Sequence, residues 1–118
     1  MPSIAVRRIY GLAPGSSDSH RVLVDRLWPR GVTKATAPID EWAKDVAPSS
    51  DLRRWYDHRV DRFDEFGRRY RVELGQGVTD EAVKRLRAVA RSQDLILVTA
   101  TKDVEHSGAE VLRRVLSE

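Results

Sequence analysis

Two short runs of consecutive apolar residues constrain the fold of this chain more than any other feature. One lies within residues 21–25 (Arg-Val-Leu-Val-Asp) and the other within residues 94–99 (Asp-Leu-Ile-Leu-Val-Thr). Each has the length of a strand, and the lack of alternation with polar residues is typical of strands that are buried on both faces. A further strand is expected at residues 4–9, where β-branched residues alternate loosely with others.

The segment between these runs has the spacing of amphipathic helices. Apolar residues three and four apart predict a helical turn over residues 39–46. A helix is expected to follow Ser49 or Ser50, because either residue suits an N-cap. The clearest helix covers residues 60–74, where large apolar side chains recur every three or four positions: Val60, Phe63, Phe66, Tyr70 and Leu74.

Two more helices are expected in the second half of the chain. Thr79 is placed to cap the first of them, and Ser107 with Glu110 fits a capping box for the second. Helices that alternate with buried strands predict an α/β fold, with a small, mostly parallel sheet of about three or four strands covered by helices. We expect residues 1–118 to form a single domain.

Several classes of site are excluded or disfavoured by composition. The chain has no cysteine, which excludes a disulfide framework, a thiolate zinc site, an iron–sulfur cluster and a cysteine nucleophile. The histidines His20, His58 and His106 lack the spacing of metal ligands, and no Walker A, GxGxxG or HExxH motif is present. We therefore expect no metal and no cofactor. No signal peptide or membrane-spanning stretch is evident, so a cytoplasmic location without membrane partners is expected.

The charge balance is mildly basic. The chain has 21 Lys and Arg against 18 Asp and Glu, a net charge of +3 and a pI near 9.6. One alternative function, a nucleic-acid-binding or regulatory module, fits this pI and the abundance of arginine. Such modules normally collect their excess charge on one face. Here acids and bases are mixed, and Asp80 with Lys84 and Glu81 with Arg85 are expected to pair along one helix.

The richest chemistry follows the ends of the two apolar strands. Asp25, Arg26, Trp28 and Arg30 come directly after the first, and the loop at residues 99–107 comes after the second. If the two strands are parallel neighbours, both exits share one edge of the sheet. Open α/β sheets place their ligands at such an edge.

Cationic groups from the two segments predict an anion site. Arg26, Arg30 and Lys102 would converge on the start of the last helix near Ser107, where unpaired amides suit a phosphate or carboxylate. The predicted ligand-binding residues are therefore Arg26, Trp28, Arg30, Lys102 and Ser107. The expected ligand is small and phosphorylated, anionic or nucleotide-like. The sequence specifies neither its identity nor the oligomeric state of the protein.

The candidates for catalytic groups are Asp25, Asp103 and His106. A neutral imidazole just before a helix suits a base or a hydrogen-bond donor. A hydrolase would combine His106 or His58 with one of the two carboxylates within hydrogen-bond reach. Ser107 is interpreted as a helix cap rather than a nucleophile. Whether the protein is an enzyme stays open at this point.

The other site residues also have structural alternatives. Asp25 and Arg26 suit ion pairs that brace the loop, and Trp28 suits the core. Arg30 suits an exposed turn, and the pair at 102–103 suits a solvated loop. Alanine replacement of Arg26 and Arg30 distinguishes a structural from a ligand-binding role, because residues that brace the fold contribute to stability whereas residues that only bind a ligand do not.

Four blocks carry a family resemblance: residues 21–31 (RVLVDRLWPRG), 42–49 (WAKDVAPS), 52–58 (LRRWYDH) and 95–106, with Phe63, Phe66, Tyr70, Glu73 and Leu74 between them. The chain resembles the YeaO-like family of bacterial proteins, a domain of unknown function. The resemblance covers nearly the whole chain and implies a compact α/β domain without an established activity. More distant relatives carry Cys-His-Arg after the third strand, where this chain has Ser-Gly-Ala at 107–109.

Overall fold

Four parallel strands form one sheet in the computed structural model, which describes residues 3–15 and 18–118. The strands are β1 (Ile4–Arg8), β2 (Ser19–Leu23), β3 (Glu41–Trp42) and β4 (Asp94–Thr99), in the spatial order β1-β4-β2-β3. The central strand β4 pairs on both sides, with Leu97 opposite Val6 and Val22. The predicted α/β class with a small parallel sheet is confirmed.

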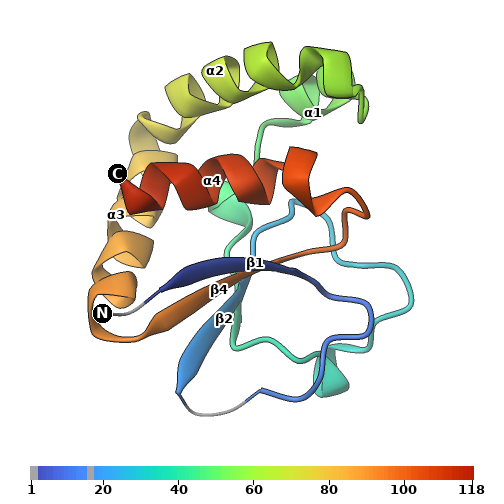
Figure 1. Ribbon diagram of the computed structural model, residues 1–118, viewed down its shortest axis with the longest axis vertical. Helices are drawn as coiled ribbons and strands as arrows, with labels where there is room; N and C mark the ends of the chain where they lie inside the picture. The colour runs from blue at the N-terminus through green and yellow to red at the C-terminus, as the bar shows by residue number, and fades with distance from the viewer. Residues whose placement is uncertain (1–2, 16–17) are drawn as a thin grey trace.

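The described residues also form four α-helices: α1 (Ser50–Tyr56), α2 (Phe63–Leu74), α3 (Gly77–Ser92) and α4 (Gly108–Ser117). Figure 1 shows α4 lying along the sheet over β1 and β4, with α2 beyond it. In this described part of the chain, no helix combines the length and apolar character that a membrane crossing requires.

The two faces of the sheet are buried by different kinds of structure. Val22, Leu95 and Leu97 face the helices and belong to the main hydrophobic core. Leu23 and Val98 face the other way, where they pack against a layer of loops that includes residues 28–42. Burial on both faces, by Val22 and Leu23 in β2 and by Leu97 and Val98 in β4, accounts for the consecutive apolar residues in these strands.

The start of α1 is fixed by Ser49, as predicted. Its Oγ accepts a hydrogen bond from the Leu52 amide at 3.2 Å and donates one to Glu73 Oε2 of α2 at 2.6 Å. After α1, Asp57 and His58 both have positive φ angles, 49° and 53°, which reverse the chain sharply. These contacts fix α1 beside the carboxyl-terminal edge of the sheet.

Two local predictions are wrong. Residues 39–46 form β3 and a single 3-10 turn instead of an α-helical turn, because the edge of β2 captures the backbone: the Ala43 amide donates to the Leu23 carbonyl at 2.8 Å. Thr79 does not cap α3. That helix begins at Gly77, whose φ of 54° permits the sharp turn from α2.

Candidate functional site

A cleft of about 600 Å³ lies at the carboxyl-terminal edge of the sheet, where β2 and β4 end. Residues 24–30, after β2, form one wall, and residues 100–101 and 106–109, after β4, form a second. A third wall comes from α1 and the turn that follows it, within residues 53–58. Because β2 and β4 are parallel neighbours, the two strand exits share one edge, as the sequence predicts.

Asp25 lines the cleft and joins the two strand exits. Its Oδ1 accepts a hydrogen bond from the Thr99 hydroxyl at 2.7 Å, and its Oδ2 accepts one from the Ala100 amide at 2.8 Å. Burial raises the pKa of Asp25 above its ordinary value, although these two hydrogen bonds and the charge of Arg53 lower it in part. Both carboxylate oxygens are thus engaged by the end of β4.

Arg26 lines the cleft and also braces the chain before α1. Its Nε donates to the Pro48 carbonyl at 3.1 Å, and its Nη2 lies 3.5 Å from the Ala47 carbonyl oxygen. These contacts tie the exit of β2 to the segment that leads into α1. They match the bracing role that the sequence left open for this residue.

Trp28 also serves both the cleft wall and the loop layer. Its Nε1 donates to the Val32 carbonyl at 2.6 Å, which closes the turn after Arg30. The ring packs edge-on against Trp42, with centroids 5.3 Å apart. The indole is therefore held in one position by its neighbours while part of its surface lines the cleft.

Two exposed cations line the cleft from different walls. Arg30 follows β2, and Arg53 projects from α1. Among residues 3–15 and 18–118, neither guanidinium donates a hydrogen bond or forms an ion pair, although the charge of Arg53 acts on Asp25 across the cleft. Arginines on fixed elements whose guanidinium groups make no direct contact with a carboxylate are suited to an anion from solution.

The loop after β4 arranges its predicted residues in two groups. Lys102 and Asp103 do not line the cleft, whereas His106 does. Asp103 Oδ2 lies 2.8 Å from His106 Nδ1, so this carboxylate–imidazole pair is within hydrogen-bond reach. The His106 ring packs edge-on against Phe63, and the His106 carbonyl accepts a hydrogen bond from the Tyr56 hydroxyl at 2.6 Å.

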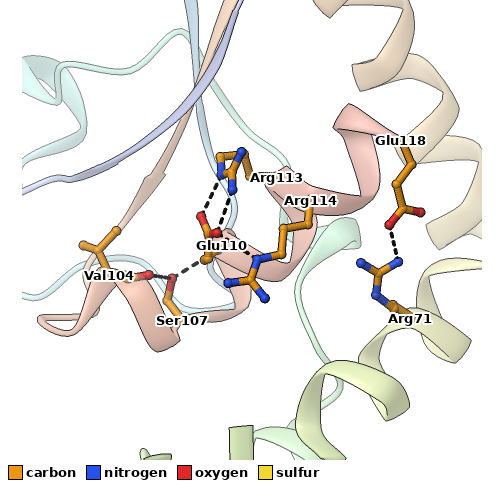
Figure 2. Close-up of polar contacts among 7 residues, drawn as sticks. All are labelled: Arg71, Val104, Ser107, Glu110, Arg113, Arg114 and Glu118. Atoms are coloured by element: carbon orange, nitrogen blue, oxygen red, sulfur yellow. Dashed lines mark hydrogen bonds and ion pairs between the residues drawn. The ribbon is translucent and has the colours of Figure 1, made fainter. Parts of the chain in front are cut away.

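Ser107 caps α4 (Figure 2). Its Oγ accepts from the Glu110 amide at 3.2 Å and donates to the Val104 carbonyl at 2.7 Å, and the residue is 2% exposed. The Glu110 side chain does not accept a hydrogen bond from the Ser107 amide, as it would in a capping box; that amide donates to the Val104 carbonyl. Glu110 pairs with Arg113 and Arg114 instead. Their hydrogen bonds hold the pKa of Glu110 below its ordinary value despite desolvation. The hydroxyl is thus committed to the cap.

No group of three or more His, Asp or Glu in the described part of the chain is placed to hold a metal ion. The groups that the cleft presents are the guanidiniums of Arg30 and Arg53 and the imidazoles of His58 and His106. A nucleophilic side chain in hydrogen-bond contact with the His106 imidazole is not present among the described residues.

On the α1 side, sequence reasoning missed Arg53 and Tyr56 as lining residues, whereas His58, named as a possible catalytic histidine, does line the cleft. The helical spacing of Leu52 and Tyr56 marks the buried face of α1 but does not say which sheet edge the helix reaches. Burial, followed by the charge of Asp103, raises the pKa of Tyr56 to about 12. Tyr56 is therefore a neutral hydroxyl that holds the His106 carbonyl, rather than a base.

The family described as the inactive DUF488-N3 subclade matches residues 3–118. The chain belongs to this family. The uncharacterized protein Rv3073c of Mycobacterium tuberculosis is 43% identical over 115 residues, which cover 97% of this chain and 93% of the relative. The uncharacterized protein YeaO of Escherichia coli is 38% identical over 110 residues, which cover 93% of each chain. No solved structure matches this chain.

The resemblance to YeaO-like proteins is thus confirmed. At residues 107–109, where the resemblance implies a Cys-His-Arg triplet in more distant relatives, this chain has Ser-Gly-Ala. In its place this member of the family has the Ser107 cap and Gly108, where a Cβ would approach Pro48 Cγ to 3.2 Å. The small residue lets the start of α4 pack closely against the segment before α1.

Proposed function

We propose that this protein binds a small phosphorylated or nucleotide-like anion in the cleft at the carboxyl-terminal edge of the sheet. The observation that carries the proposal is the placement of Arg30 and Arg53 on two walls of one cleft, with no hydrogen bond or ion pair from either guanidinium in the described part of the chain. Guanidinium groups bind phosphate oxygens through paired, charge-assisted hydrogen bonds.

The start of α4 supports the same ligand class. Gly108 and Ala109 belong to the first turn of this helix and line the cleft. First-turn amides have no partner inside a helix, and the helix dipole makes this end partly positive. An anion between the two arginines and α4 would therefore meet positive potential from three directions.

The remaining lining suits a ligand with a ring. Tyr10, Trp28 and Tyr56 contribute aromatic surface to the cleft. Asp25 adds a carboxyl group, but its oxygens are directed to Thr99 and Ala100. Aromatic walls beside cationic groups are the combination that a nucleotide or another phosphorylated ring compound requires.

The alternative, nucleic-acid binding, has less support because many arginines are already paired. Arg68 and Arg69 both contact Glu65 on α2. Arg113 and Arg114 both contact Glu110 on α4 (Figure 2). Pairing of this kind reduces the charge that these helices can offer to a phosphate backbone.

Calorimetric titration with inorganic phosphate, pyrophosphate and AMP tests the proposal. The wild type is expected to bind at least one of them, and Arg30→Gln and Arg53→Gln are each expected to weaken binding about tenfold or more, the size of a lost charged hydrogen bond. Arg54→Gln is the matched control, since Arg54 is exposed on α1, pairs with Asp51 and does not line the cleft.

Two results would overturn the proposal. One is the absence of any binding by the wild type at millimolar ligand. The other is an equal loss of affinity in Arg53→Gln and Arg54→Gln, which would indicate the general charge of α1 rather than a site. Salt-sensitive gel shifts with DNA or RNA, in the absence of small-ligand binding, would favour the alternative.

A further inference from the structure

We propose that the cleft prefers doubly charged tetrahedral oxyanions, such as a phosphomonoester dianion, because His106 supplies a third cation when it is protonated. The inference rests on the proposed function of the cleft. It adds a charge class for the ligand and a residue that selects it. Asp103 is the positioning residue, since it contacts the imidazole and does not line the cleft.

The contact between Asp103 and His106 decides which ring nitrogen is free. An ionised carboxylate can only accept hydrogen bonds, so the proton of the 2.8 Å contact lies on Nδ1. This leaves Nε2 as the nitrogen that gains a proton. Once protonated, Nε2 is a charged donor, and the imidazole keeps its orientation because Asp103 and the edge-on contact with Phe63 hold it.

Both acidic and basic groups lie near His106. Asp103 and Glu105 lie on the same turn, and Asp25 lies in the cleft. The positive groups oppose protonation until an anion neutralises them. The other charged and titratable groups that line the cleft with His106 and Asp25 are Tyr10, Arg26, Arg30, Arg53, Tyr56 and His58. Arg114 lies over the Phe63 ring, with its Cζ 5.7 Å from the ring centroid.

A second negative charge on the ligand is what makes the third cation matter. Arg30 and Arg53 can between them contact the oxygens of a singly charged ligand. A dianion between the same groups still carries excess negative charge, which a protonated His106 compensates. Loss of His106 charge should therefore weaken a dianion more than a monoanion of similar shape.

Sulfate and methyl sulfate provide a direct test, because sulfate stays doubly charged and methyl sulfate singly charged across the range in which histidine titrates. For the wild type, calorimetry is expected to show sulfate binding about fivefold or more tighter at about pH 6 than at about pH 8. Methyl sulfate should change by about twofold or less. His106→Gln should remove the pH dependence for sulfate, and Asp103→Asn should reduce it.

His58→Gln is the matched control, because His58 also lines the cleft but has no carboxylate contact in the described residues. It should retain the pH dependence of the wild type. Side-chain NMR of the wild type gives a second readout that does not depend on a variant folding. Saturating sulfate should move the titration midpoint of the His106 ring upward, since an anion that prefers the protonated ring must stabilise it.

The outcomes separate the two proposals. If the wild type binds none of phosphate, pyrophosphate, AMP and sulfate, the proposed function fails and this inference fails with it. If phosphate binds and Arg53→Gln weakens it, but His106→Gln keeps the pH dependence of the wild type, only this inference is overturned. Loss of the pH dependence of sulfate binding in His58→Gln would also overturn it. So would a His106 titration midpoint that saturating sulfate leaves unchanged.

Discussion

The carboxylate of Asp25, just beyond the end of β2, accepts a hydrogen bond of 2.7 Å from the hydroxyl of Thr99, the last residue of β4. This contact joins the exits of two neighbouring parallel strands at the point where the cleft opens. It also places a carboxyl group beside a predicted anion site with both of its oxygens already occupied.

Replacement of Asp25 should separate the hydrogen bonds of this carboxyl from its charge. Asp25→Ala leaves the Thr99 hydroxyl and the Ala100 amide without an acceptor, and we expect it to lower the free energy of unfolding by about 2–3 kcal/mol. Asp25→Asn keeps one acceptor and removes a charge whose burial is unfavourable, so about 1 kcal/mol or less is expected. Urea unfolding followed by circular dichroism measures both.

The difference in stability between the wild type and Asp25→Asn should depend on pH in one direction. Because burial raises the pKa of Asp25 in the folded state, the folded protein binds its proton more readily than the unfolded chain. The stability of the wild type relative to Asp25→Asn should therefore increase as the pH falls through the folded pKa toward the ordinary value of 3.8. A stability difference that shrinks on acidification would contradict this.

Arg26 and Arg30 should differ in their effect on stability. Arg26 donates to the backbone at Pro48 and Ala47, whereas the guanidinium of Arg30 is exposed and has no acceptor in the described residues. We expect Arg26→Ala to cost about 1–2 kcal/mol and Arg30→Ala less than about 0.5 kcal/mol. Thermal unfolding without ligand is the measurement, and equal losses would show that the bracing contacts contribute little.

Glu41 should contribute to the acid sensitivity of the fold. Desolvation raises its pKa, but hydrogen bonds from Arg85 and His20 outweigh this and bring the pKa below the ordinary 4.5. Its stabilising contribution is complete above that value and is lost as the pH falls through the lower, folded pKa. Glu41→Gln should therefore be less stable than the wild type near neutral pH, with the difference closing as the pH falls from 4.5 through the lower, folded pKa.

Acid titrations of unfolding free energy test this, with Glu81→Gln as a control at an exposed carboxylate on α3. The control should differ from the wild type by less than about 0.5 kcal/mol. A difference between wild type and Glu41→Gln that stays constant down to acid pH would assign the effect of the substitution to packing rather than charge.

Two glycine-to-alanine substitutions should have opposite effects. Gly67 lies inside α2, where a Cβ would meet Val111 at 3.7 Å, an ordinary contact. We expect Gly67→Ala to stabilise the protein by about 0.5–1 kcal/mol through helix propensity. Gly108→Ala would place its Cβ 3.2 Å from Pro48 Cγ, at a position outside the helix interior, and should destabilise by about 1 kcal/mol. Differential scanning calorimetry of both variants decides; stabilisation by Gly108→Ala would mean that Pro48 yields freely.

The spacing of apolar residues along the sequence was sufficient to predict the central strand and the long amphipathic helix of the fold. The apolar run at 94–99 became β4, and the spacing of Phe63, Phe66 and Tyr70 became the buried face of α2. Ser49 and Ser107 were recognisable as caps because their hydroxyls bond amides only three residues away. Each of these outcomes depends on neighbours within a few residues, which is why the sequence predicts them.

The cleft was predictable only in part. The sequence places Arg26, Arg30 and the start of α4 at one edge once β2 and β4 are parallel neighbours. It does not show that Arg53 reaches the same cleft or that Lys102 does not, because both depend on how α1 and the 102–106 loop pack. Helical spacing indicates which residues share a face but not what that face meets.

What the sequence by itself determined is the class of fold, its buried strands and its helix caps. Only the tertiary structure decided that residues 41–42 form an edge strand, and that Arg85 pairs with Glu41 instead of Glu81. The physical reason is the range of the interactions. Strand and helix signals are local, whereas a guanidinium pairs with whichever carboxylate the folded chain brings near, and Glu41 is 44 residues from Arg85 along the sequence.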